Sequence, residues 1–255
     1  MRTVHDSLTQ GRIEGFYSVT MLTIEGMMRK DRADVFAGTR TVMQPETSEL
    51  TKNVDLPDAV REKVGEADVE TVRLEIRVEQ PDRKPLHPEN AARVRAAKAV
   101  GLRVLKAVPR LGAFHIKDPS GEYYLDPGKG DALKAWDDRA CAVARAIEAR
   151  GVGMAQIKEL GERLGEAGSQ SPWFRSLDRA EDIHEEREVE RAFGEWADGD
   201  SIAAHIAYGI DVFCSDDFGK SNAAGSILDH ANRAWLSKTY GVQFATLEEL
   251  AGRLP

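Results

Sequence analysis

Periodic apolar positions predict helices separated by short strands along most of the chain. Apolar residues recur every three or four positions in three stretches that each stop at a glycine, over 132–150, 154–164 and 224–240. Shorter β-prone runs occupy 13–17, 102–108, 212–214 and 242–245. Residues 69–78 alternate apolar and charged side chains, which predicts a strand with one solvated face near a sheet edge. Helices and strands that alternate at this spacing predict an α/β fold with a parallel sheet.

Capping and turn residues assign the remaining segments. We expect further helices over 2–10, 18–32, 58–66, 88–100, 181–195 and from 247 onward. Ser18 or Thr20 suits the start of the second of these, and Thr246 with Glu249 forms a capping box for the last. Residues 36–58 are rich in turn formers and predict a surface connection with little regular structure.

Residues 195–220 carry the densest candidate chemistry. They predict a helix that opens on Asp198 and Asp200, a tight glycine turn, and a short buried strand that stops before Asp216 and Asp217. In an α/β fold, active sites form beyond the carboxyl ends of the strands. The start of a helix and the exit of the next strand can therefore bring these carboxylates to one point.

Convergent carboxylates favour a hard divalent cation. Mg²⁺ and Mn²⁺ prefer oxygen ligands, with water and substrate phosphate completing the shell. One metal lowers the pKa of an attacking water, and a second stabilises the leaving oxygen of a phosphodiester. Asp200 at a helix start would also be stabilised by the helix dipole. Taken singly, Asp198 and Asp200 also fit helix caps and Asp216 fits a turn, so the structural explanation stands beside the functional one.

Composition and charge describe an ordinary globular chain with one basic region. The chain has 255 residues, which suffices for one large domain or two small ones. Its net charge of −8 argues against a broad basic surface for non-specific nucleic-acid binding. Basic residues nevertheless concentrate in one segment, at Arg93, Arg95, Lys98, Arg103, Lys106 and Arg110. This segment fits either a solvated helix face or a ridge that contacts phosphates.

The cysteines and the apolar runs indicate the compartment. Cys141 and Cys214 form no paired motif, and Cys214 lies in an apolar run where a buried thiol is expected. No apolar run is long enough to cross a bilayer, and the N-terminus lacks the apolar core of a signal peptide. We therefore expect a cytoplasmic protein that does not bind membranes.

The motifs of the C-terminal part resemble those of a known family. An Asp that opens an Ala-rich helix over 200–207 is followed by an apolar strand that ends in Ser215, Asp216 and Asp217. This order resembles the C-terminal half of a PIN domain, and residues 241–250 resemble the last strand and helix of that family.

The early part of the chain resembles the same family. Residues 11–25 are similar to the segment in which a PIN helix carries an acidic ligand after a start rich in Ser and Thr. The resemblance covers about 1–40 and 190–255, which would form the family-like core of a single domain over 1–255. It implies a three-layer α/β/α fold with a central, mostly parallel sheet, and residues 41–189 would form an enlarged helical middle.

The resemblance also implies an activity and the residues for it. The activity is Mg²⁺- or Mn²⁺-dependent endonucleolytic cleavage of RNA, and one role that fits is the toxin of a bacterial toxin–antitoxin pair. Glu25, Asp200 and Asp217 would be the catalytic metal ligands, assisted by Asp216 and Asp198, and Ser215 would support the site by hydrogen bonds. The partners that fit are RNA, an antitoxin or another protein, and a second copy of the chain.

One departure from the family pattern keeps a second function open. The family's first acidic ligand is an Asp that ends an apolar strand at the start of the domain. Residues 1–11 contain no such strand, and Asp6 lies in a predicted helix. Either the chain starts late or it is a degenerate member. The alternative function is therefore a catalytically degenerate PIN-like protein that binds RNA or a protein partner, and a more distant one is another metal-dependent phosphohydrolase on a similar sheet.

Overall fold

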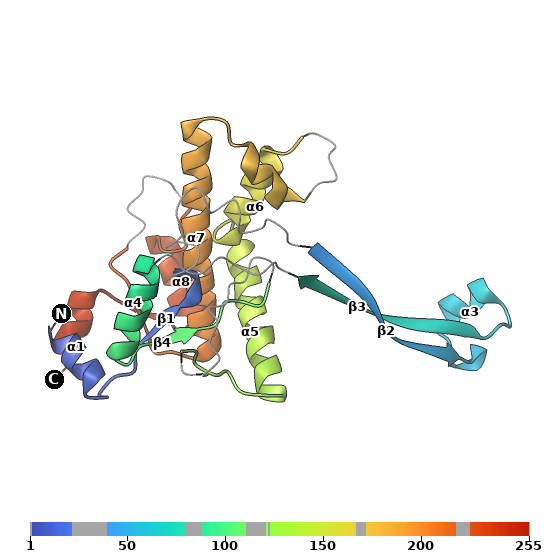
Figure 1. Ribbon diagram of the computed structural model, residues 1–255, viewed down its shortest axis with the longest axis horizontal. Helices are drawn as coiled ribbons and strands as arrows, with labels where there is room; N and C mark the ends of the chain where they lie inside the picture. Colours follow the sequence, from blue (N-terminus) through green and yellow to red (C-terminus); the bar gives the residue numbers. More distant parts are fainter. Residues whose placement is uncertain are drawn as a thin grey trace. The chain divides into compact units, whose positions relative to one another are not determined.

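The computed structural model describes residues 2–21, 40–79, 88–110, 121, 123–166, 172–217 and 225–254 (Figure 1). The chain divides into two compact units. The larger, which we call the core unit, comprises 1–35 and 84–255, and the smaller, the hairpin unit, comprises 36–83. The sequence had predicted a single domain over the whole chain. Each unit is described by itself below.

The hairpin unit is a long antiparallel strand pair with two short helices at its turn. Its elements are β2 (Arg40–Thr51), η3 (Asn53–Asp55), α3 (Asp58–Val64) and β3 (Val69–Glu79). The register runs from Thr51 opposite Val69 to Arg40 opposite Glu79, with an irregularity between Pro45 and Thr47. The predicted helix over 58–66 and strand over 69–78 are confirmed.

The predicted irregular connection over 36–58 is wrong, because residues 40–51 form strand β2. Pro45 was one of the residues that suggested a loop, since proline cannot donate to a strand ladder. In the hairpin it sits next to the irregularity in the register, where a strand tolerates proline. The pairing with β3 supplies the hydrogen bonds of β2, and this long-range partner is not visible in the local sequence.

The core unit is mixed α/β and contains two short pairs of parallel strands. β1 (Phe16–Ser18) pairs with β4 (Arg103–Leu105), and β5 (Val212–Cys214) pairs with β6 (Gln243–Ala245). Tyr124 adds a parallel bridge to Val104. The predicted parallel pairing is confirmed for these strands, which lie in separate two-stranded sheets within the described chain. Cys214, predicted to be buried, is exposed at the end of β5.

Helices make up most of the core unit and agree with the sequence in most places. They are α1 (Arg2–Thr9), α4 (Pro88–Ala99), α5 (Asp131–Glu148), α6 (Met154–Arg163), η4 (Trp173–Arg179), α7 (Ile183–Tyr208), α8 (His230–Tyr240) and α9 (Leu247–Arg253). The capping box of Thr246 and Glu249 is present. Asp229 caps α8, which begins at His230, six residues after the predicted start at 224. Of the predicted helix over 18–32, Val19 and Thr20 are helical, and residues 22–39, including Glu25, lie outside the described residues.

Helix α7 shows that the predicted helix start near Asp200 is wrong. It runs for 26 residues without a break, from the Asp182 cap to Gly209, which adopts a left-handed conformation with φ of 69°. The predicted surface helix over 181–195 and the predicted helix starting near Asp200 are therefore one helix, and Asp200 lies in its third quarter. Asp200 gains nothing from a helix N-terminus, because the dipole effect falls off within the first turn.

Gly199 in α7 serves helix packing. A Cβ on Gly199 would stand 3.0 Å from the Cα of Gly153, at the start of α6. Next to this contact, the buried carboxylate of Glu195 accepts hydrogen bonds from the backbone N–H groups of Gly153 at 3.2 Å and Ile227 at 2.6 Å. Gly199 therefore lets the α5–α6 turn approach α7 closely.

The hydrophobic core lies where α5, α7 and α8 pack together. Buried members come from α5 (Trp136, Ala140, Val143, Ala144, Ile147), α7 (Ile202, Ala203, Ile206, Ala207) and α8 (Leu236). Helices α5 and α7 run side by side in Figure 1. A smaller cluster of Val19, Val104 and Ala107 lies beside β1 and β4. The parallel strand pair thus has a small apolar cluster of its own, and β1 lies close to α7.

We predict that Gly199→Ala destabilises the protein by about 1–3 kcal/mol, because the new methyl group meets the backbone of Gly153. Urea unfolding followed by circular dichroism measures this change. The matched control is Gly194→Ala in the same helix, where a Cβ meets no atom within 4 Å. This control should gain about 0.5–1 kcal/mol, since alanine is the better helix former. Equal effects of the two substitutions would contradict the packing role of Gly199.

Candidate functional site

The segments that follow β1 and β4 meet α7 at residues 200 and 201. Thr20, two residues beyond β1, has its Oγ1 3.4 Å from the Oγ of Ser201. Arg110, five residues beyond β4, donates a hydrogen bond to Asp200. Parallel strands place their functional residues beyond their carboxyl ends, so this is where an α/β fold builds a site. We call Ser18, Thr20, Arg110, Asp200 and Ser201 the carboxyl-end site.

A chain of alternating charges runs through the carboxyl-end site. The Arg110 guanidinium donates one hydrogen bond to Oδ1 of Asp200 and another to Oε1 of Glu148 on α5. Lys158 of α6 then donates through Nζ to Oε2 of Glu148 at 2.5 Å. The Asp200 side chain is 1% exposed, whereas Arg110 and Glu148 are 16% and 17% exposed. The two acids and two bases balance each other along a line from buried Asp200 to Lys158, whose side chain is 38% exposed.

The environment of Asp200 determines its protonation. Burial raises the pKa of Asp200. Two neighbours act in the opposite direction and lower this pKa, which are the charge and hydrogen bond of Arg110 and the indole of Trp196. A buried carboxylate without a cation is costly to ionise, so Arg110 is what keeps an ionised Asp200 tolerable inside the protein.

Three buried hydroxyl groups connect the end of β1 to α7. Ser18 Oγ and Thr20 Oγ1 lie 2.5 Å apart, and Ser18 Oγ accepts a hydrogen bond from the Thr20 N–H at 3.3 Å. Ser201 donates to the carbonyl of Ala197 at 2.7 Å and lies within reach of Thr20. The predicted capping role of Ser18 agrees with its bond to the Thr20 backbone. The hydroxyl groups hold the exit of β1 beside Asp200.

The carboxylates after β5 have structural partners. Asp216 Oδ1 accepts a hydrogen bond from the N–H of Leu247 at 3.2 Å, at the start of α9. Ser215 Oγ accepts from the N–H of Asp217 at 3.1 Å, and Arg233 donates to the Asp217 carbonyl oxygen. The Asp217 side chain itself is exposed. The structural role that the sequence left open for Asp216 is therefore supported by its hydrogen bond. Ser215 supports the same turn.

Among the described residues, the predicted metal ligands do not come together. Within the described part of the chain, no three His, Cys, Asp or Glu side chains are grouped so that they could hold a metal ion. Asp200 contacts Arg110, Asp198 lies about 200° around α7 from it, and Glu25 lies outside the described residues. The metal site of Glu25, Asp200 and Asp217 stays a prediction.

Sequence reasoning missed the partners of Asp200, which are Arg110, Glu148 and Lys158. Arg110 had been assigned with its neighbours to a solvated or phosphate-contacting segment. Its two ion pairs join positions 38 and 90 residues apart in sequence. A local signal was its position after a β-prone run, since that is where α/β folds place functional side chains.

His205 is packed into the protein. Its ring meets the ring of Phe213 edge-on, with centroids 5.5 Å apart, and its Nε2 has no hydrogen-bond partner. Burial lowers the pKa of His205 to about 4, although the charge of Asp211 acts in the opposite direction. The imidazole is therefore neutral at neutral pH.

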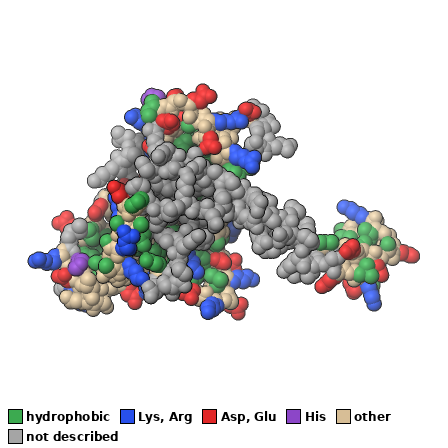
Figure 2. Space-filling view, in the orientation of Figure 1, with side chains coloured by type: hydrophobic (Ala, Val, Ile, Leu, Met, Phe, Trp, Pro, Cys, Tyr) green, Lys and Arg blue, Asp and Glu red, His purple; other side chains and the backbone are tan. Residues whose placement is uncertain are grey.

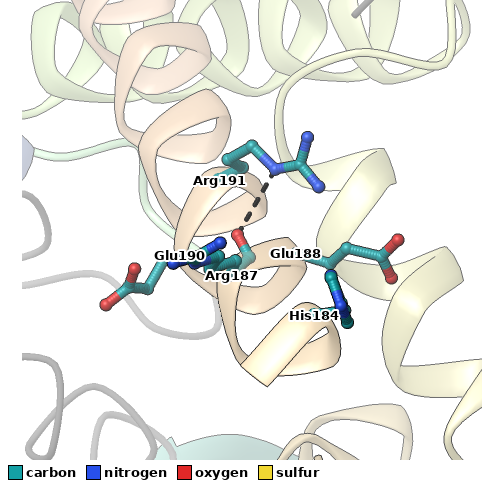
Figure 3. A pocket seen from close by; sticks show the side chains of 5 residues that line it. All are labelled: His184, Arg187, Glu188, Glu190 and Arg191. Carbon is teal, nitrogen blue, oxygen red and sulfur yellow. Dashed lines mark hydrogen bonds between the residues drawn. The ribbon is translucent and has the colours of Figure 1, made fainter. Parts of the chain in front are cut away.

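A pocket of about 430 Å³ lies on the first turns of α7, away from Asp200 in the sequence (Figure 3). Its lining is charged and of mixed sign: His184, Arg187, Glu188, Glu190 and Arg191. Glu188 pairs with Arg163 of α6, and Arg191 Nε donates to the Arg187 carbonyl at 3.4 Å. We interpret it as a solvated helix face.

Comparisons of this chain with protein-family models, curated proteins and solved structures find no match. The resemblance to PIN domains therefore remains a prediction from the motifs. None of the described helices combines the length and the apolar character needed to cross a membrane.

We predict that Arg110→Ala destabilises the protein by about 3–5 kcal/mol, because it leaves Asp200 buried without its cation. Loss of Arg110 also raises the pKa of Asp200 further, so the folded state binds the proton more tightly than the unfolded state does. The deficit should therefore shrink as the pH falls from 8 towards 5. Urea unfolding at both pH values measures it. The control is Arg139→Ala at an exposed position of α5, with an expected change within about 0.5 kcal/mol.

We predict that His205→Gln weakens the acid sensitivity of the fold. The pKa of His205 lies near 4 in the folded protein and near 6.5 in an unfolded chain, so protonation of the unfolded state destabilises the protein as the pH falls through this window. Between pH 7 and pH 5 this residue should remove about 2 kcal/mol from the stability of the unaltered protein. The variant should lose that much less, and exposed His184→Gln should behave like the unaltered protein.

Proposed function

We propose that the chain is a PIN-like protein that binds RNA and that its acidic centre is catalytically degenerate. The observation that carries this proposal is the buried ion pair of Asp200 with Arg110. Asp200 is the position that matches the Asp opening the Ala-rich helix of PIN domains. In this chain its Oδ1 already accepts from a guanidinium.

The residues around Asp200 fit a divalent cation poorly. A metal ligated by Oδ1 would lie against the positive charge of Arg110, which Glu148 also holds in place. Coulomb repulsion at such short range in a buried site is several kcal/mol or more. Arg110 would have to leave both carboxylates before a metal could bind there. We therefore derive no catalytic step through a metal at Asp200.

The end of β1 supports the same proposal. β1 is the first strand of the described chain, and it ends at Ser18, whereas the family places its first acidic ligand at the end of the first strand. A serine hydroxyl is neutral and a weak ligand for Mg²⁺ or Mn²⁺ compared with a carboxylate. With β1 as the family's first strand, its pairing with β4 and the flanking helices are compatible with a three-layer α/β/α arrangement.

Basic side chains of α4 and β4 support RNA as the ligand. Arg93, Arg95 and Lys98 are exposed or near-exposed along α4, and Arg103 and Lys106 follow in the strand and just beyond it. Lys98 lies 4.5 Å from the centroid of the Tyr123 ring. Clustered cations with nearby aromatic rings suit a single-stranded nucleic acid, whose phosphates pair with the cations and whose bases stack.

A second candidate is the Mg²⁺- or Mn²⁺-dependent endoribonuclease, with or without an antitoxin. It is favoured by the exposed Asp217 at the end of β5 and by the burial of Asp200, since acids at strand ends are where such enzymes bind metal. In this case Arg110 would be displaced by the metal, and Glu25 would supply a further ligand.

One experiment separates the two candidates. Purified protein is mixed with labelled single-stranded RNA in Mn²⁺, and both cleavage and fluorescence anisotropy are recorded. We expect binding that weakens with salt and with Arg93→Ala combined with Arg95→Ala, and no cleavage that depends on Asp217. Cleavage that Asp217→Asn abolishes would establish the nuclease instead. Absence of both binding and cleavage would contradict both candidates.

A further inference from the structure

The turn end of the hairpin unit exposes apolar side chains that nothing in the unit covers. We call residues 49–72 the hairpin tip. Leu50 is 73% exposed, Val54 72%, Val72 47% and Val60 39%, and these are four of the six exposed large apolar residues in the described chain. Leu56 is the one described residue of the tip that is buried. The tip shows its mixture of apolar and charged side chains in Figure 2.

An apolar tip on a two-stranded sheet suggests an interaction surface. An isolated two-stranded hairpin is only marginally stable in water, because it has no second layer against which to bury its side chains. Single exposed apolar residues are common, but a group of them on one small unit marks a place where another surface binds. Hydrogen bonds at the turn order the backbone of the tip without covering its apolar side chains. The Asn53 side chain, for example, donates to the Gly65 carbonyl at 2.5 Å.

The charge of the tip selects the kind of partner. The tip contains seven acidic and three basic residues, which gives it a net charge of −4. Two tips would therefore repel each other, whereas a basic surface would attract one tip.

The core unit carries a surface of the opposite charge. Residues 88–109 contain five basic residues and one acidic residue, a net charge of +4. We call the exposed side of α4 with Arg103 and Lys106 the basic face. Between its arginines and Lys98, the exposed side chains of α4 are small, at Ala92, Ala96 and Ala99. Small side chains at four- and three-residue spacing leave room for bulkier apolar ones from a partner.

We propose that the hairpin tip of one copy of the chain docks on the basic face of a second copy. Leu50 and Val54 contact the alanines of α4, and the acidic residues of the tip pair with its arginines. In the proposed dimer, the tip of each copy docks on the basic face of the other, so both surfaces of both copies are used. The basic face then serves either a second copy or the RNA proposed above, and the dimer itself does not depend on RNA binding.

The test is the molar mass of the full chain, free of nucleic acid, measured by sedimentation over a range of concentration and salt. We expect a dimer that dissociates as salt increases. Leu50→Ser combined with Val54→Ser should weaken the dimer about tenfold or more, because both residues are exposed at its centre. Thermal unfolding of this variant should match the unaltered protein, since neither side chain is packed in the fold.

A charge exchange makes the test specific for the two surfaces. One variant reverses two charges on the face with Arg93→Glu and Arg95→Glu, which takes its net charge from +4 to 0. The other reverses two charges on the tip with Glu62→Lys and Glu66→Lys, which takes its net charge from −4 to 0. Each variant alone should be monomeric, and an equimolar mixture should form a heterodimer, because the unaltered tip of one variant meets the unaltered face of the other. The matched control, Arg187→Glu with Arg191→Glu at two exposed positions of α7, should remain a dimer.

Three outcomes would overturn the proposal. They are a monomer at every concentration, a dimer that survives reversal of either surface, and a mixture of the two reversed variants that fails to associate. No RNA is present in these measurements, so their failure leaves the RNA-binding proposal untouched. Conversely, loss of RNA binding without loss of the dimer would count against the RNA proposal alone.

Discussion

The buried pair of Arg110 and Asp200 is the interaction on which the arrangement around the carboxyl-end site depends. A carboxylate that is 1% exposed needs a cation beside it, and that cation comes from the segment beyond β4. The pair therefore fixes where this segment crosses α7. Glu148 and Lys158 extend the same charge alternation to α5 and α6, so three helices and a strand exit share one electrostatic centre. We interpret this centre as the reason why α7 can hold the carboxylate of Asp200 at a buried position.

Local signals predicted the helices well, because periodicity and caps are properties of neighbouring residues. The capping box at Thr246 and the end of α7 at Gly209 are both present in the structure. The same local rules failed within α7, where Asp198 and Asp200 were predicted to open a new helix. Gly199 between them is explained by the approach of Gly153 from 46 positions away, which only the folded chain reveals. Strand β2 was missed for the same physical reason, since its stability comes from β3.

The candidate site divides along the same line. That Asp200 is a special residue could be seen from its place in a motif, and so could the turn after β5. What Asp200 contacts could not be seen, because Arg110 looked like its basic neighbours until the fold turned it inwards. The sequence thus drew attention to Asp200 but counted only acids, and it left out the base that pairs with this one. A motif that specifies ligand types needs the charges of its surroundings before it specifies chemistry.

The clamp formed by Glu195 has a consequence for the order in which this protein assembles. Its carboxylate is buried, with a pKa raised mainly by burial, and it accepts from backbone groups of residues 153 and 227, on either side of it in sequence. During synthesis, the first of these groups leaves the ribosome before α7 does, and the second only afterwards. Until Ile227 has emerged, α7 cannot bury Glu195 with its full complement of donors. The central turns of α7 therefore reach their final packing late. A nascent chain that stalls before residue 227 has an incomplete core.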